Sequence, residues 1–450
     1  MLGYTPWDPQ TSTKAFRWIF KVEDGLFQVH ALIYPILLLA TLYSWLLLPT
    51  RIFTHLKSRL QSKLKHENTD LLGKAWMKSG LVFTLMLSIL LPLIPYCPSL
   101  NPYFKPASTD IRYYRKWLEN MLGLDLRGAL EYAFYGQSNR PLYLLLLYCL
   151  TGLGIPKDLV LNLEALLIAP MFALSVYLSA KRLSRNHLYA VLASLAGILG
   201  FNMTVSMAAG FFAAWAALTF FYVCIALVSS LDRRKTANLT ALIIASLMIL
   251  FIHPWTWSLL MTVLSLHLIF SSLRNLLNRR FSVDKWLLTA LSVNIVVDFL
   301  KMSLAPQQGR LEAAMTNLDA GKFIAFEHLF DQVLFLRRLS TSYMGGSFYN
   351  PLHMTLALIG FLSILLKLRE MSCQLLFIWI TVVSLILPFS NLSAQAHLLY
   401  ATPFPLLIAE GLWRCSHFLG KMNCKLSIWF QLFFLSSSLS YTLRILSNLV

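Results

Sequence analysis

Apolar residues recur along this chain in runs of about 20 residues, and short polar stretches separate the runs. The runs show no strict alternation of apolar and polar positions, so they predict helices rather than the strands of a membrane barrel. A helix of about 20 apolar residues crosses the hydrocarbon core of a bilayer. We therefore predict an all-α, polytopic helical membrane protein with about twelve transmembrane helices. The predicted spans are 31–50, 79–96, 159–180, 187–203, 208–230, 236–252, 254–273, 285–304, 351–368, 373–389, 396–413 and 426–446.

One apolar stretch, from Pro141 to Ile155, is predicted not to cross the membrane. As a helix of about 15 residues it would be roughly 22 Å long, which is shorter than a hydrocarbon core of about 30 Å. Lys and Arg gather in short loops, such as 51–78, 181–185 and 414–425, which the positive-inside tendency places in the cytoplasm. These loops fall on one side of the membrane only if 141–155 lies at the outer face.

The composition agrees with a membrane protein. Hydrophobic residues make up 57% of the chain and charged residues only 13%, whereas soluble domains are about a quarter charged. The formal net charge of +18 comes largely from the basic loops, so it predicts membrane orientation and no nucleic-acid partner. The six cysteines contain no CxxC pair, and neither a disulfide framework nor a zinc site is indicated.

This topology divides the chain into four parts. Residues 1–78 hold one extra span and a basic cytoplasmic loop, and residues 79–304 hold a seven-span module with a first outer loop at 97–158. A second outer loop covers 305–350, and further transmembrane helices cover 351–450. Loops of this length are uncommon unless they are functional, so we expect the chemistry in the two outer loops, on the extracytoplasmic side.

The first outer loop contains a predicted amphipathic helix that begins near Asp110. Ser108 or Thr109 is expected to cap it, with Asp110 in the first turn, where the helix dipole favours an anion. Its apolar face, which we expect to contact the bilayer, comprises Tyr113, Tyr114, Trp117 and Met121. Two interpretations remain open: an ordinary interfacial helix, or a carboxylate held outside the membrane as a general base. Asp125 and Glu131 are weaker acidic candidates in the same loop.

Three more polar residues lie near the outer ends of predicted spans. His253 precedes two tryptophans that suit an interfacial anchor, and its ring is also a candidate to bind sugar or phosphate. Asp298 lies within a predicted span, where a carboxylate is costly and marks a functional site by default, although a hydrogen bond to a neighbour explains it as well. Glu164 is interpreted in the same way.

In the second outer loop, Arg337 and Arg338 belong to a mixed-charge pattern that suits either solvated helices or a lid.

Four segments, in this order along the chain, suggest a family. They are Asn139–Tyr148 (NRPLYLLLLY), Leu178–Ser184 (LSAKRLS), Tyr343–His353 (YMGGSFYNPLH) and His397–Leu407 (HLLYATPFPLL). With an acidic residue in the preceding outer loop, this order resembles the GT-C superfamily of membrane glycosyltransferases, of the protein mannosyltransferase and aminoarabinose transferase type. The resemblance covers about residues 79–413.

The resemblance implies transfer of a sugar from a polyprenyl-phosphate donor to a protein, lipid or glycan acceptor. Asp110 would be the general base, and a cation would stabilise the departing lipid phosphate. Where the family often has a late arginine this chain has His397, so the phosphate partner is sought among Arg140, Arg337 and Arg338 as well. The chain has no DxD or WWDxG motif, and a divalent metal cofactor is not supported.

Other functional classes also fit the sequence. A secondary transporter or lipid flippase is the main alternative, and it would place polar residues through the membrane midplane. A polymerase or ligase acting on lipid-linked glycans, or a non-catalytic scaffold, would also fit a chain of this kind.

Overall fold

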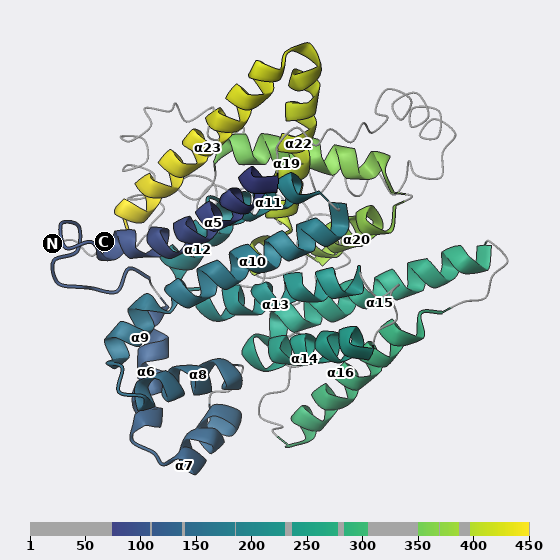
Figure 1. Ribbon diagram of the computed structural model, residues 1–450. Coiled ribbons are helices and arrows are strands. Elements are labelled where there is room, and N and C mark those ends of the chain that lie inside the picture. The colour runs from purple at the N-terminus through teal and green to yellow at the C-terminus, as the bar shows by residue number, and fades with distance from the viewer. Residues whose placement is uncertain are drawn as a thin grey trace, which may run out of the picture.

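In the computed structural model, the structure describes residues 74–108, 110–136, 140–184, 186–229, 236–277, 283–304, 350–368, 370–386 and 397–449. Every regular element in these ranges is a helix (Figure 1). In chain order they are α5 (Lys74–Leu90), η1 (Leu91–Tyr96), α6 (Ile111–Leu122), α7 (Leu126–Glu131), η2 (Tyr132–Gly136), α8 (Pro141–Gly152), α9 (Lys157–Leu163), α10 (Ala165–Ser184), α11 (His187–Ile198), α12 (Phe201–Ala209), α13 (Phe212–Val228), α14 (Thr236–Ile252), α15 (Pro254–Leu277), α16 (Lys285–Leu304), α19 (Pro351–Leu366), α20 (Met371–Ile386), α22 (Phe404–Met422) and α23 (Cys424–Ser447). The predicted span at 31–50 and the residues Arg337 and Arg338 lie outside the described part of the chain.

Within the described ranges, five helical segments are long and apolar enough to cross a membrane, as in a helical membrane protein. They are Ser79–Tyr96, Lys157–Ser184, His187–Ala209, Pro254–Leu276 and Lys285–Leu304. Shorter apolar helices are found at Pro141–Gly152, Phe212–Val228, Thr236–Ile252, Leu352–Leu366 and Ser372–Ile386.

Exposed apolar stripes on the outside of the bundle suit contact with lipid. The exposed side chains of α10 recur every three or four residues, which places them on one helical face: Leu167, Met171, Leu174 and Leu178. On α16 the exposed side chains are Ile295, Val296, Phe299, Leu300 and Leu304. Large contiguous apolar surfaces are unfavourable in water and are satisfied in a bilayer.

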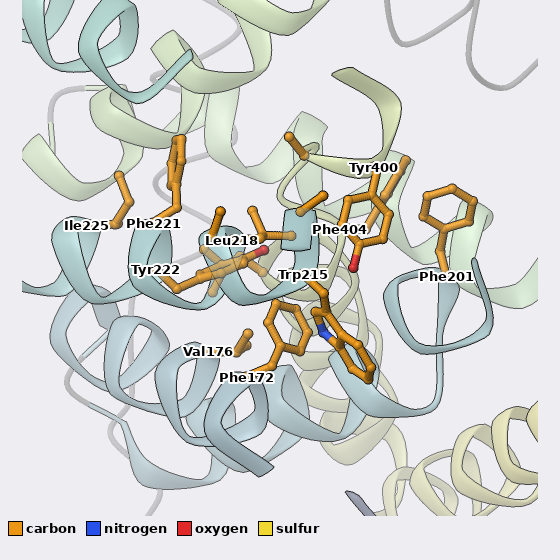
Figure 2. Packing of buried hydrophobic residues seen from close by; sticks show 14 of the residues in the cluster. Phe172, Val176, Phe201, Trp215, Leu218, Phe221, Tyr222, Ile225, Tyr400 and Phe404 are labelled. Atoms are coloured by element: carbon orange, nitrogen blue, oxygen red, sulfur yellow. The ribbon is translucent and has the colours of Figure 1, made fainter. Parts of the chain in front are cut away.

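The centre of the bundle is packed with aromatic side chains. Figure 2 shows Phe172 from α10 beside Trp215 and Tyr222 from α13, and its ring centroid lies 6.0 Å from that of Trp215 and 5.6 Å from that of Tyr222. Trp379 of α20 stacks on Phe221 of α13 with 4.4 Å between the centroids. Helices from both halves of the chain therefore share one core.

Helices α19 and α22 approach each other through glycine. A Cβ atom added at Gly360 would lie 1.9 Å from the carbonyl oxygen of Leu407, and one added at Gly411 would lie 1.9 Å from that of Leu356. Only glycine allows the two backbones this contact, which fixes α22 and the residues that precede it against the bundle.

The structure moves two predicted helix boundaries. The segment predicted to end at 203 continues to Ala209, because α12 ends only at Gly210, which adopts the left-handed conformation with φ +79°. The helix predicted at 396–413 is interrupted instead: residues 397–400 are helical, the chain turns at 401–403, and α22 begins at Phe404, because Pro403 and Pro405 lack the N–H groups that a continuous helix from His397 would need.

Helices α6 to α9 form a layer beside the bundle, at the lower left of Figure 1. Helix α8 has 12 residues, which give it a length of about 18 Å, shorter than a hydrocarbon core of about 30 Å. The expectation that the apolar face of α6 contacts the bilayer is wrong for Tyr114 and Met121. Both are buried, because α6 packs against α8 and α9; Tyr113 remains exposed.

Candidate functional site

Several candidate residues that are far apart in the sequence meet where helix ends come together. Asp110 precedes α6, Arg140 precedes α8, His253 separates α14 from α15, and His397 lies in the segment before α22. The turn at Gly210 and Phe211, between α12 and α13, lies among them. We refer to Asp110, Arg140, His253 and His397 as the helix-end cluster.

The backbone of α12 holds Asp110 in place. The Asp110 N–H donates to the carbonyl of Ala209 over 3.1 Å, and the hydroxyl of Ser108 donates to the carbonyl of Met207 over 2.6 Å. The last carbonyls of a helix have no partner within that helix, so the 108–110 segment satisfies two of them. The prediction that Ser108 caps α6 is therefore wrong: Asp110 itself occupies the cap position, without a side-chain hydrogen bond to the helix.

Gly210 makes this contact sterically possible. A Cβ atom at Gly210 would lie 2.9 Å from the Cβ of Asp110, and its positive φ disfavours any other residue. The position of Asp110 thus depends on a glycine one hundred residues further along the chain.

Arg140 is half-buried and is held by tyrosines rather than by an acid. Its Nη1 donates to the hydroxyl of Tyr114, and its guanidinium lies 5.5 Å from the centroid of that ring. Tyr114 contacts Tyr143 edge to face, with 5.3 Å between centroids, and Tyr143 donates its hydroxyl to the carboxylate of Glu164. No carboxylate of the described residues forms an ion pair with Arg140. Its remaining donors are therefore available for an anion.

The two histidines form the other side of the cluster. Their ring centroids are 5.0 Å apart, and His397 stacks on Phe211 at 4.7 Å. The Nδ1 atom of His253 lies 2.8 Å from the hydroxyl of Thr256 and accepts from the Thr256 N–H at 3.4 Å, which leaves Nε2 to carry the ring proton. The Nδ1 atom of His397 is buried and has no hydrogen-bond partner among the described residues.

Burial sets the charge of these groups. It raises the pKa of Asp110 above its usual range, although Arg140 and then Arg112 act in the opposite direction. Burial lowers the pKa of His253, and His397 and Arg140 lower it further, so this histidine is neutral. Burial also raises the pKa of Tyr114 to about 12. Arg140 is thus the fixed positive charge of the helix-end cluster.

The remaining acidic candidates have other surroundings. Asp125 caps α7 by accepting from the N–H of Gly128 at 2.7 Å, and the exposed Glu131 pairs with Arg127 at 3.1 Å. Asp298 is half-buried in α16, one turn after Asn294. Asn294 accepts from Trp257 and donates to Ser246, so α16 is fixed against α14 and α15. Glu164 is buried at the start of α10 and contacts the cluster only through tyrosines.

Sequence reasoning did not single out Tyr114, Tyr143 or Phe211. The sequence predicts a lipid-facing position for Tyr114, and Tyr143 lies in the Asn139–Tyr148 segment of the family resemblance. Their roles depend on partners in other helices, so no local pattern identifies them. Within the described ranges, no group of three or more His, Cys, Asp and Glu side chains lies close enough to hold a metal ion.

Comparison with known proteins gives no relative from which a role could be transferred. No protein-family model matches the chain, and no curated protein is significantly similar to it in sequence. The function must therefore be inferred from the chemistry of the helix-end cluster.

Proposed function

We propose that this protein is a membrane glycosyltransferase that moves a sugar from a polyprenyl-phosphate donor to an acceptor at the extracytoplasmic face. The observation that carries the proposal is Arg140, a half-buried cation that forms no ion pair among the described residues, beside the half-buried carboxylate of Asp110 and the histidines His253 (buried) and His397 (half-buried). This arrangement suits a substrate that brings both an anion and a hydroxyl to one place.

The proposed reaction divides the cluster into two functions. Asp110 removes the proton from the acceptor hydroxyl as the oxygen forms its bond to the anomeric carbon of the donor sugar. The bond between that carbon and the phosphate oxygen breaks, and its electron pair remains on the lipid phosphate. Arg140 stabilises the charge that develops there, for which a planar guanidinium is well suited.

The backbone around the cluster supports an anionic substrate. Helices α6, α8 and α15 begin directly after Asp110, Arg140 and His253, and α13 begins after Phe211, which stacks on His397, so four positive helix-dipole ends adjoin the cluster. Free N–H groups at such termini favour phosphate. The neutral His253 can donate from Nε2 to a phosphate oxygen or a sugar hydroxyl without competing with Arg140 for charge.

Four parts of the proposal come from the sequence alone. These are the number of about twelve spans, the GT-C arrangement of two outer loops, the extracytoplasmic location of the cluster, and the participation of Arg337 and Arg338 in phosphate binding. In this topology the α12–α13 turn, the α14–α15 turn and the start of α10 all fall on the outer side, which agrees with their meeting at one cluster.

The test is a transfer assay with the full chain in lipid nanodiscs. Polyprenyl-phosphate donors with different radiolabelled sugars are incubated with pooled hydroxyl acceptors, and release of free polyprenyl phosphate is measured together with label in the acceptor. We expect both products to appear in equal amounts. If no donor releases lipid phosphate, while sealed vesicles accumulate a solute or exchange lipid between leaflets, the protein is a transporter or flippase instead.

A further inference from the structure

A buried chain of polar and aromatic contacts leads from Glu164 to Arg140. The Tyr143 hydroxyl donates to Glu164, the ring of Tyr143 packs edge to face on Tyr114, and the Tyr114 hydroxyl accepts from Arg140. The exposed fractions of Tyr114, Tyr143 and Glu164 are 1%, 2% and 5%. Nothing in the proposed transfer reaction uses these three side chains directly.

Packing leaves each member of this chain little freedom. Tyr143 comes from α8 and Tyr114 from α6, and Glu164 lies between α9 and α10, so three separate elements fix the arrangement. Trp117 adds a second edge-to-face contact to Tyr114 at 5.5 Å. One oxygen of Glu164 accepts from Tyr143, while the other is buried without a partner among the described residues. Tyr143 is therefore the side-chain hydrogen-bond partner of Glu164 among the described residues.

The partner of Arg140 is a tyrosine hydroxyl and not a carboxylate, which explains why its guanidinium can still bind an anion. A carboxylate at the place of the Tyr114 hydroxyl would neutralise the guanidinium and occupy two of its donors. A tyrosine hydroxyl occupies one donor and adds no charge, because burial keeps it protonated. Asp110 interacts electrostatically with Arg140 but forms no ion pair with it.

We propose that Glu164, Tyr143 and Tyr114 are positioning residues. They orient Arg140 without neutralising its charge, so that its guanidinium can bind the lipid phosphate. This inference rests on the proposed function and adds to it how the phosphate-binding arginine is oriented. The three residues do not touch the substrate. Their effect on phosphate binding passes through the guanidinium.

The experiment compares two ligands that differ only in the phosphate. Binding of decaprenyl monophosphate and of the matching alcohol, decaprenol, is measured with the full chain in nanodiscs. Wild-type protein is expected to prefer the phosphate. Tyr114→Phe removes the acceptor of Arg140 and should weaken phosphate binding about 10-fold, as expected for a lost hydrogen bond to a charged group, with decaprenol binding unchanged.

The neighbouring tyrosine provides a matched control. The hydroxyl of Tyr113 also accepts from an arginine, Arg112, at 3.2 Å, but Tyr113 is 46% exposed and lies outside the buried chain. Tyr113→Phe should therefore bind both ligands as the wild type does. Equal losses of phosphate and alcohol binding in Tyr114→Phe would mean a purely structural role and would overturn the inference.

Four further variants test whether the effect on phosphate binding extends back to Glu164. Tyr143→Phe should reduce phosphate binding severalfold, and the double variant Tyr114→Phe/Tyr143→Phe should lose less than the sum of the two. Glu164→Gln keeps an acceptor oxygen for Tyr143 and should retain most of the phosphate preference, whereas Glu164→Leu should lose it. Additive losses, or full binding by Glu164→Leu, would contradict the positioning chain.

The two proposals fail differently. A wild type that does not distinguish decaprenyl monophosphate from decaprenol would contradict the proposed function itself. A wild type with a clear phosphate preference that Tyr114→Phe and Tyr143→Phe both retain would leave the proposed function standing and remove the positioning chain.

Discussion

The segment 97–158 carries the same residue types in two different settings. At its inner edge Asp110 and Arg140 are half-buried among helix ends, whereas at its outer edge the side chains of Arg127 and Glu131 are 87% and 59% exposed and pair with each other. An exposed ion pair of this kind contributes about 0–1 kcal/mol to stability. In the inner setting burial raises the pKa of Asp110, and Asp110 and Arg140 form no ion pair. The position of these residues in the fold, and not their residue type, therefore distinguishes the candidate site from the solvated surface.

We expect the largest change in transfer rate when the inner carboxylate, Asp110, is replaced, and none when the outer carboxylate, Glu131, is replaced. Asp110→Asn keeps the shape but removes the base, so transfer should fall by about 10²–10⁴-fold. Glu131→Gln breaks only the exposed pair and should leave transfer unchanged. Initial rates at saturating donor measure both variants. Full activity of Asp110→Asn in a folded protein would exclude it as the base.

The arginines give the next largest effect. Arg140→Gln removes the fixed positive charge of the cluster and should weaken binding of decaprenyl monophosphate by about 10- to 100-fold. Arg127→Gln, at the outer edge, should change it by less than about 2-fold. Equilibrium binding with the labelled lipid provides the measurement, and similar losses in both variants would indicate a general surface attraction instead of a site.

Substitutions of two glycines test whether the α12–α13 turn holds Asp110 in the inner setting. Gly210→Ala places a Cβ against Asp110 and forces a left-handed residue to carry a side chain, so stability should fall by about 1–3 kcal/mol. Gly123→Ala, at the end of α6, meets nothing within 4 Å and has φ −80°, so its stability should stay within about 0.5 kcal/mol. Thermal unfolding in detergent compares the two. Equal stability would show that the α12 turn does not constrain the 108–110 segment.

The smallest expected effect is a shift in pH dependence. Asp110 accepts a proton only when ionised, so the transfer rate should fall as pH decreases through its raised pKa, at a pH above the ordinary aspartate value of about 4. Arg140 acts to lower that pKa, so the acid limb of the residual activity of Arg140→Gln should lie at higher pH than in the wild type. Glu131→Gln should not move it. A limb that stays in place in Arg140→Gln would argue that another group limits the rate.

Hydropathy determined that this chain has membrane-type helices, since long apolar runs have few other stable environments. It did not determine where each helix lies. The most apolar 18-residue stretches of His187–Ala209 and Lys285–Leu304 have mean hydropathies of 1.7 and 1.6, yet 94% of the residues in the first stretch and 22% of those in the second are buried inside the protein. Lipid and protein interior are both apolar, so composition alone hardly separates a central helix from a peripheral one.

For the site, polar residues beside the apolar runs pointed to Asp110 and His253, and the family resemblance added Arg140 and His397 as candidate phosphate partners. Only the tertiary structure decided that these four lie together, while Asp125 and Glu131 lie in a helix cap and a surface pair. It also replaced the expected lipid-facing role of Tyr114 with a contact to Arg140. The physical reason is that burial and hydrogen-bond partners come from residues distant in the sequence, such as Gly210 for Asp110 and Phe211 for His397. Local pattern fixes the helices and their ends, and packing fixes which ends meet.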